Sequence, residues 1–241
     1  MRRFVLITRH PADCTELQKL LDPCGLTLRP YPVLRLVEDW DEGGWKAVTE
    51  RFPTSSTIGR IVVASPRAPK PFVEACRRIG AEHLLELPAA AVGSSTEIAA
   101  REAGLHVDTV GPGTGIGLAH HLNQIIDAPA TVILACGRER RLELQNTLAA
   151  AGHEVLPVVV YRMDPTPPRE LPPLGPSLEA VVLTSPRAAE LYLAGVGGLP
   201  LPCPHWALGP TTRDAAAALG MRCSIPQKPS IESLAEELCK I

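Results

Sequence analysis

The sequence predicts an α/β protein of two doubly wound parallel-sheet lobes that arose by internal duplication. Three observations predict this fold class. Short, β-branched apolar runs alternate with helical stretches, three blocks of sequence recur in the same order, and each copy contains one linker-like segment after its second predicted strand. Because helices cover both faces of a parallel sheet, its strands are apolar throughout, as these runs are.

Each copy contains five predicted strands, which makes it flavodoxin-like in strand count. Helical stretches with apolar residues at i, i+3 and i+4 separate the strands, for example Glu16–Leu21 and Leu142–Ala151. The predicted strands are 4–8, 27–34, 61–65, 84–88 and 90–94 in the first copy, and 131–136, 155–161, 180–185, 205–209 and 222–226 in the second.

The duplication is visible as three aligned blocks. Residues 17–35 align with 144–162 at a spacing of 127, residues 64–68 (ASPRA) with 184–188 (TSPRA) at 120, and residues 91–104 with 207–220 at 116. The spacing shrinks along the chain, as expected when loops shorten after a duplication. A chance likeness between strand–turn–helix units explains one block, but not three in the same order.

Two segments have the composition of linkers. Residues 36–44 are charged and contain two glycines, and six of the thirteen residues in 164–176 are proline. If the chain crosses between lobes at these linkers, residues 1–35 join 177–241 in a discontinuous lobe one, and residues 45–163 form lobe two. We expect two crossings and a cleft between the lobes.

Composition excludes several classes of function. The net charge is −2, no basic block is present, and Phe, Trp and Tyr number three each, which argues against a nucleic-acid partner. The longest apolar stretches fall far short of the roughly 20 residues that cross a bilayer, and the chain does not start like a secretory signal. We expect a cytoplasmic protein without a membrane partner, whose seven scattered cysteines are reduced.

Small or hydroxylated residues follow the predicted strands. Ser65 and Ser185 suit helix N-caps and Pro66 and Pro186 the first helical position, so capping alone explains the two Ser-Pro-Arg turns. The carboxyl ends of parallel strands share one edge, however, so the helices that follow them direct free N–H groups to one crevice, which suits an anion. The other residues placed at strand ends are Thr8, Arg9, Thr96, Thr114, Arg138 and Thr212.

Other chemistry has little support. The segment GPGTGIG (111–117) fits neither nucleotide-binding glycine pattern, and neither serine of the Ser-Pro-Arg turns lies in G-x-S-x-G. His120 and His121 lack a partner at ligand spacing, so a solvated helix face is favoured over a metal site.

Several motifs in order resemble those of the uroporphyrinogen-III synthase family. They are VLITRHP near the start, the strand-ending Ser-Pro turns, V/L-G-x-x-T at 92–96 and 208–212, and VVVYR before a proline-rich crossing. The resemblance covers essentially the whole chain. It implies two flavodoxin-like lobes and an enzyme that cyclises linear hydroxymethylbilane to uroporphyrinogen III, with loss of water and inversion of ring D through a spiro intermediate. It implies no cofactor and no metal.

The resemblance also implies roles for individual residues. Tyr161 matches the tyrosine thought to act as general acid on the departing hydroxyl; its repeat counterpart is Leu34, and without the resemblance it is expected to pack at a strand end with its hydroxyl in water. Arg67 and Arg187 stand where the family often has asparagine, so their role stays open. Residues that match binding positions are Thr8, Arg9, Ser65, Thr96, Thr114, Arg138, Ser185 and Thr212.

Partners and alternatives follow from this assignment. We expect a monomer that takes hydroxymethylbilane, handed over by hydroxymethylbilane synthase, for haem, sirohaem or cobalamin biosynthesis. The alternative is a non-catalytic two-lobed protein that binds or senses a tetrapyrrole or a small anion. A regulator needs an output module, for which 241 residues leave no room, and a periplasmic binder needs a signal peptide, which we do not expect here.

Overall fold

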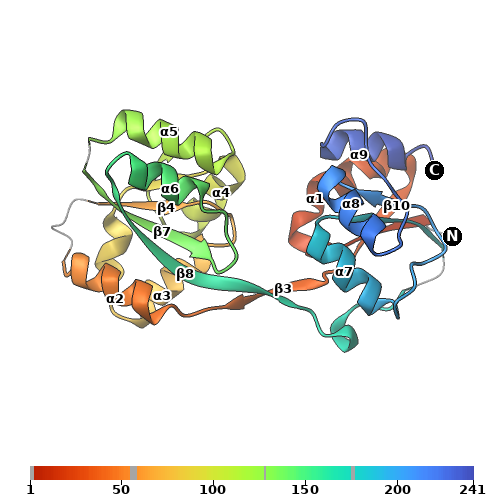
Figure 1. The fold of residues 1–241 in the computed structure, drawn as a ribbon, viewed down its shortest axis with the longest axis horizontal. Helices are drawn as coiled ribbons and strands as arrows, with labels where there is room; N and C mark the ends of the chain where they lie inside the picture. Colours follow the sequence, from red (N-terminus) through yellow and green to blue (C-terminus); the bar gives the residue numbers. More distant parts are fainter. Residues whose placement is uncertain (1–2, 55–58, 128, 175–176) are drawn as a thin grey trace. The chain divides into compact units, whose positions relative to one another are not determined.

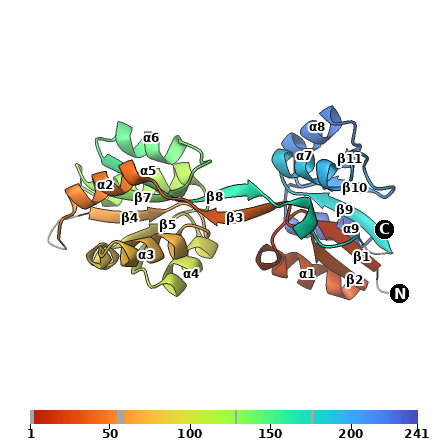
Figure 2. The same cartoon turned by 90° about the horizontal axis from the view of Figure 1, so that it is seen from below.

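The structure is a computed structural model that describes residues 3–54, 59–127, 129–174 and 177–241. The chain forms two compact units: unit 1 is Met1–Arg35 with Asp164–Ile241, and unit 2 is Leu36–Met163 (Figures 1 and 2). Each unit has a sheet with helices on both faces, so the predicted α/β class with two lobes is confirmed. None of the helices in these described ranges is long and apolar enough to cross a membrane.

Unit 1 contains a five-stranded, fully parallel sheet. Val5 and Ile7 pack under α1 (Thr15–Leu21) and α9 (Ile231–Leu238), whereas Leu6 between them packs on the opposite face, under α7 (Pro186–Gly195) and α8 (Pro210–Ala218). This alternation explains why the strands are apolar throughout. In spatial order the strands are β11 (Cys223–Ser224), β10 (His205–Ala207), β9 (Leu178–Leu183), β1 (Arg3–Ile7) and β2 (Leu26–Pro30).

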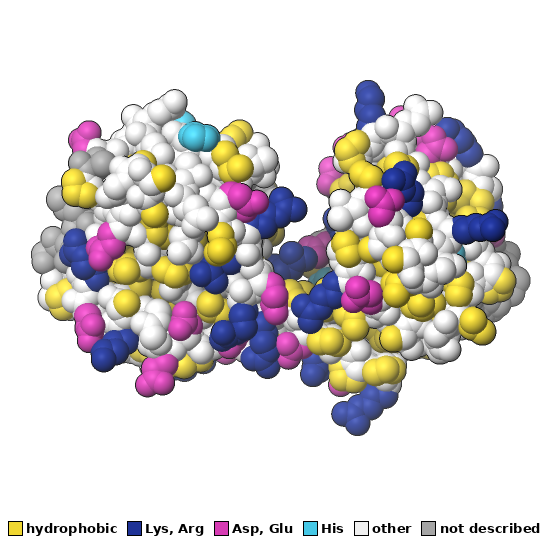
Figure 3. Space-filling model, in the orientation of Figure 1, with side chains coloured by type: hydrophobic (Ala, Val, Ile, Leu, Met, Phe, Trp, Pro, Cys, Tyr) yellow, Lys and Arg dark blue, Asp and Glu magenta, His cyan; other side chains and the backbone are white. Residues whose placement is uncertain are grey.

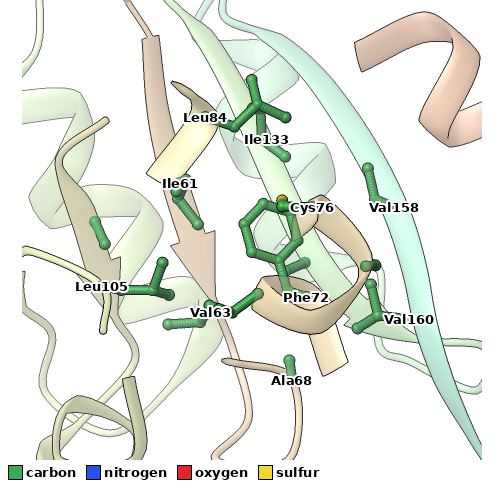
Figure 4. Close-up of a cluster of buried hydrophobic side chains, with 14 of the residues drawn as sticks. Ile61, Val63, Ala68, Phe72, Cys76, Leu84, Leu105, Ile133, Val158 and Val160 are labelled. Carbon is green, nitrogen blue, oxygen red and sulfur yellow. The ribbon is translucent and has the colours of Figure 1, made fainter. Parts of the chain in front are cut away.

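Unit 2 contains a six-stranded sheet. Helices α2 (Glu42–Arg51), α3 (Pro69–Arg78) and α4 (Ser94–Ala103) cover one face, and α5 (Gly115–Ile125) and α6 (Glu143–Ala150) cover the other. The ring of Phe72 from α3 is fully buried against the sheet, among Ile61, Val63 and Val158 (Figure 4). In spatial order the strands are β3 (Leu34–Glu38), β8 (Glu154–Pro165), β7 (Thr131–Gly137), β4 (Gly59–Val63), β5 (Ala89–Ala91) and β6 (Val107–Val110).

The ladder registers reproduce the repeat spacings found in the sequence. The order β2–β1–β9–β10–β11 of unit 1 corresponds to β8–β7–β4–β5–β6 of unit 2. Equivalent residues of the two sheets are 127 apart in the first two strands of each copy, 120 apart in the third and 116 apart in the fourth. The matched pairings are Ile7–Val182 with Leu134–Val62, Ile7–Pro30 with Leu134–Pro157, and Val181–His205 with Ile61–Ala89. Apart from β3, each unit thus takes two strands from one copy and three from the other.

One predicted strand is wrong, and the two edge strands of unit 2, β3 and β6, were missed. Residues Glu82–Glu86 form the 3₁₀ helix η3, so 84–88 is not a strand. A short apolar run does not distinguish a strand from a buried helical turn, and Leu84 is fully buried in this one. The missed strand β6 has the sequence VDTV, in which buried and exposed residues alternate.

The two Ser-Pro-Arg turns also differ from one another. Ser185 caps α7 as predicted, with Pro186 at the first helical position and Ala189 N–H donating to the Ser185 carbonyl at 3.0 Å. Helix α3 begins only at Pro69, so the predicted start at Pro66 is wrong. The reason is that Pro69 stands where Ala189 does and has no N–H to donate, so Ala68 N–H closes a turn onto Ser65 at 3.1 Å instead.

The segments predicted as linkers contain regular structure. The unit boundaries at 35/36 and 163/164 fall inside β3 and β8. The N–H of Asp39 donates to Val160 at 3.2 Å and that of Thr166 to Val33 at 2.9 Å, so these two stretches run in opposite directions. The second segment also contains the 3₁₀ helix η4 (Pro168–Glu170).

One pair of cysteines is bonded. Cys24 and Cys239 form a disulfide with their Cα atoms 5.5 Å apart, which corrects the expectation that all seven cysteines are reduced. The pair is 215 residues apart in sequence, and the packing of α1 on α9 brings it together. The other five are free, and Cys14, Cys76 and Cys136 are buried, as packing residues are.

Candidate active site

A cavity of about 630 Å³ lies in unit 2, at the carboxyl edge of its sheet. Its floor is formed by the last residues of β7, Leu134 to Gly137, and its walls by the turn after β4 and the first residues of α5 and α6. In a parallel α/β sheet this is the edge where ligands bind, because the strands end there and the helices that follow begin there.

Three of the predicted site residues line this cavity: Ser65, Thr114 and Tyr161. Thr114 is the N-cap of α5, and its Oγ1 accepts from Gly117 N–H at 3.2 Å. The Oγ of Ser65 accepts from Arg67 N–H at 3.2 Å, within the turn after β4. Both hydroxyls still carry a proton to donate, so each can bind an acceptor in the cavity.

Unlike Ser65 and Thr114, Tyr161 packs in a hydrophobic cluster. Its side chain joins the core cluster under α2 and α3 and is only 8% exposed. No hydrogen bond to its hydroxyl occurs within the described ranges, and the hydroxyl is not among the fully buried unpaired polar atoms there, while the residue lines the cavity. The phenol is therefore free to donate a proton or a hydrogen bond to a molecule in the cavity.

Gly137 allows the ring of Tyr161 to lie where it does. A Cβ at Gly137 would stand 2.7 Å from Cζ and 3.0 Å from the hydroxyl oxygen of Tyr161. Gly137 is the last residue of β7 and also lines the cavity. The importance of this missing side chain is not visible in the sequence, because the close approach depends on the register between β7 and β8.

Charged side chains at the mouth of the cavity were also missed. Arg140, Arg141, Glu139 and Glu143 line it, and they belong to the connection between β7 and α6 or to the first turn of α6. The Nε of Arg140 is buried and has no hydrogen-bond partner in the part of the chain that the structure describes. Figure 3 shows acidic and basic side chains interspersed on the visible face of the molecule.

Cys136 lies at the floor of the cavity and is not a nucleophile in this environment. Burial raises the pKa of its thiol to about 11, and the sulfur donates to the carbonyl of Val158 at 3.4 Å. At neutral pH the thiol is protonated, and only a thiolate attacks.

Arg138, a predicted binding residue, lies outside the cavity lining. Its guanidinium pairs with the carboxylate of Asp39, which follows β3. That hydrogen bond and the guanidinium charge lower the pKa of Asp39, and Arg162 adds a weaker contact at 3.7 Å. In this structure Arg138 thus ties the end of β7 to the end of β3.

Four further predicted residues belong to unit 1. Thr8 follows β1, and its Oγ1 accepts from Thr184 N–H at 3.1 Å, which ties β1 to β9. Ser185 follows β9 and caps α7, so it lies at the same edge as Thr8. Thr212 is buried in the first turn of α8, and Arg9 is half-buried.

Thr96, the last predicted residue, is in unit 2 but does not line the cavity. It lies in the first turn of α4, is 1% exposed, and its Oγ1 is buried without a hydrogen-bond partner among the described residues. The structure therefore groups Ser65, Thr114 and Tyr161 in one cavity, and places the other predicted residues elsewhere.

The comparisons with known proteins agree on one family. A family model described as uroporphyrinogen-III synthase HemD matches residues 15–236. The uroporphyrinogen-III synthetase from Helicobacter pylori has a TM-score of 0.66 at 16% identity, covering 100% of this chain and 99% of that chain. A mutant uroporphyrinogen III synthase from the bacterium Thermus thermophilus has a TM-score of 0.54 at 18% identity, covering 99% and 98%. Such low identities show a shared fold alone. No curated protein sequence matches the chain.

Proposed function

The chain belongs to the uroporphyrinogen-III synthase family, and from this premise we propose that it cyclises hydroxymethylbilane to uroporphyrinogen III with inversion of ring D. It is an enzyme of tetrapyrrole biosynthesis with a small-molecule substrate. The observation that supports the proposed chemistry best is the phenol of Tyr161, which lines the cavity of unit 2 and has no hydrogen-bond partner within the described ranges.

The proposed reaction begins with loss of water. The pyrrole nitrogen donates its electron pair as the C–O bond of the hydroxymethyl group breaks, and Tyr161 donates its proton to the departing oxygen. The resulting azafulvene is attacked by the substituted carbon of ring D, which gives a spiro intermediate. That intermediate fragments and recloses with ring D inverted, and the proton lost on ring closure balances the one that Tyr161 supplied.

In the proposed mechanism the protein acts mainly by positioning the substrate. The linear substrate closes spontaneously without inversion, so the protein must favour the spiro path by holding the chain in one geometry. The first N–H groups of α5 and α6 and the guanidiniums of Arg140 and Arg141 suit the substrate's carboxylates. We keep as proposed substrate-binding residues Thr8, Arg9, Ser65, Thr96, Thr114, Arg138, Ser185 and Thr212.

The finer classification is also part of the proposal. We propose a cyclising lyase that acts as a monomer in the cytoplasm. It receives hydroxymethylbilane from hydroxymethylbilane synthase, because a substrate that closes spontaneously to the wrong isomer must be used quickly. The Cys24–Cys239 disulfide counts against the cytoplasmic location, since disulfides are rare in the reducing cytosol of mesophiles.

Tyr161→Phe tests the role of the phenol. The substitution removes the proton donor but keeps the ring, so we expect kcat for uroporphyrinogen III to fall about 10- to 1,000-fold while KM changes little. Tyr31→Phe is the matched control, because Tyr31 is a buried tyrosine of unit 1. Wild-type turnover in Tyr161→Phe would remove the phenol from the mechanism.

A further inference from the structure

The ladder around Tyr161 has no equivalent in the other unit. Strand β2 ends at Pro30, whose repeat equivalent is Pro157. Strand β8 continues past Pro157 and stays paired with β7 as far as Gly137 and Tyr161. The two copies therefore differ in the stretch of strand that carries Tyr161.

A β-bulge interrupts the ladder at this point. Cys136 pairs with Val159, but Gly137 pairs with Tyr161, so Val160 is an extra residue in β8. Side chains alternate along a strand, and Val159 packs under α5 and α6, opposite to Val160. A regular strand would place Tyr161 on the side of Val159. The bulge instead places it with Val160, in the cluster under α2 and α3.

Gly137 completes the arrangement, because any side chain there would displace the phenol. An added Cβ would lie 2.7 Å from Cζ, 2.8 Å from Cε2 and 3.0 Å from the hydroxyl oxygen of Tyr161. The backbone cannot relieve these contacts easily, since Arg138 N–H donates to the Tyr161 carbonyl at 2.9 Å. The ring is the end of a side chain beside a cavity, so the ring moves.

From this geometry we propose that Gly137 is a positioning residue for the reaction. Its missing side chain and the bulge at Val160 together fix where the hydroxyl of Tyr161 meets the substrate. The inference rests on the proposed function of Tyr161. It adds that the β7–β8 ladder sets the position of the phenol. No hydrogen-bond partner within the described residues does so.

A double-mutant cycle tests the proposal. Gly137→Ala is expected to lower kcat about tenfold or more with KM within about twofold, since it misplaces a donor without removing a binding contact. In the Tyr161→Phe background the same substitution is expected to cost less than about twofold, because the hydroxyl it acts through is gone. Equal losses in both backgrounds, or an unchanged kcat in Gly137→Ala, would overturn the proposal.

Gly59→Ala is the matched control. Its added Cβ would lie 2.4 Å from the Phe52 ring, in the same sheet but at the amino end of β4. Phe52 is 1% exposed and has no space to move, so Tm is expected to fall while kcat stays unchanged. If Gly59→Ala does not fold, Gly43→Ala replaces it, because only an atom of Asp41 at 3.8 Å lies near that position.

A readout that does not depend on activity separates this inference from the proposed function. The chain has three tyrosines, so 3-fluorotyrosine labelling gives three ¹⁹F resonances, and Tyr161→Phe assigns one of them. That resonance is expected to shift in Gly137→Ala and to stay in place in Gly59→Ala. A resonance unmoved in Gly137→Ala overturns the inference even in an active enzyme. A wild-type protein that forms no uroporphyrinogen III overturns the proposed function instead.

Discussion

Tyr192 and His205 form a buried polar pair in unit 1. The Tyr192 hydroxyl is 2.9 Å from His205 Nε2, and His205 Nδ1 is 2.8 Å from the carbonyl of Cys203. A carbonyl only accepts, so Nδ1 carries the proton and Nε2 accepts from the phenol. Burial lowers the pKa of His205 and raises that of Tyr192, which keeps both groups neutral.

This pair predicts how stability depends on pH. Because the folded pKa of His205 lies below its unfolded value of about 6.5, the unfolded chain binds more protons in the window below that value. The contribution of this pair to the free energy of unfolding is thus expected to be constant above about pH 6.5 and to fall as the pH drops below that value.

Urea unfolding of Tyr192→Phe between about pH 5 and pH 8 checks this pair. Loss of the hydroxyl leaves Nε2 buried and unpaired, so the free energy of unfolding is expected to fall by about 1–3 kcal/mol at neutral pH. The control is Tyr31→Phe, since that ring packs edge-on against Tyr192 but its hydroxyl does not bond to the histidine. Equal effects of the two substitutions would refute the role of the hydrogen bond.

At the scale of elements, one motif gives two local structures. The sequence Ser-Pro-Arg-Ala recurs, yet it caps α7 in one copy and forms a turn before α3 in the other. The difference comes from residue 69, a proline where the other copy has Ala189. The N-cap prediction was therefore right for Ser185 and wrong for Ser65, and the reason was already present in the sequence.

Capping of α7 predicts unequal effects of the same substitution. Ser185 Oγ accepts from Ala188 N–H at 3.1 Å, so Ser185→Ala is expected to lower the free energy of unfolding by about 1 kcal/mol. Ser65→Ala should cost less than half as much, because it removes an exposed bond from Arg67 N–H but keeps the carbonyl that closes the turn with Ala68 N–H. Urea midpoints of the two variants measure the difference, and equal costs would contradict it.

Some strands and some site residues could be predicted from the sequence, and others could not. Strands buried on both faces are apolar runs and could be predicted, but the edge strand β6 and the turn at Glu82–Glu86 could not, because their patterns fit more than one structure. Ser65, Thr114 and Tyr161 could be placed at strand ends. The proposed role of Gly137 and the burial of the Arg140 Nε depend on register and packing, which the sequence does not display.

For the whole molecule, the duplication explains the architecture. The three repeat spacings predict which strands are equivalent, and the ladders confirm them, so two strands of each copy complete the sheet of the other. The Cys24–Cys239 bond escaped prediction because its partners are 215 residues apart and meet only through this topology. Fold and family follow from the sequence, whereas the proposed chemistry depends on the asymmetry between the copies.

Identifying the isomer that the wild-type protein forms tests the proposed synthase activity most directly. Hydroxymethylbilane synthase supplies the linear substrate in a coupled assay, and the products are oxidised and separated as type I and type III. We predict predominantly uroporphyrinogen III, because the site must hold the substrate on the spiro path faster than it closes spontaneously. Type I product alone, from a folded protein, would contradict the proposed synthase activity.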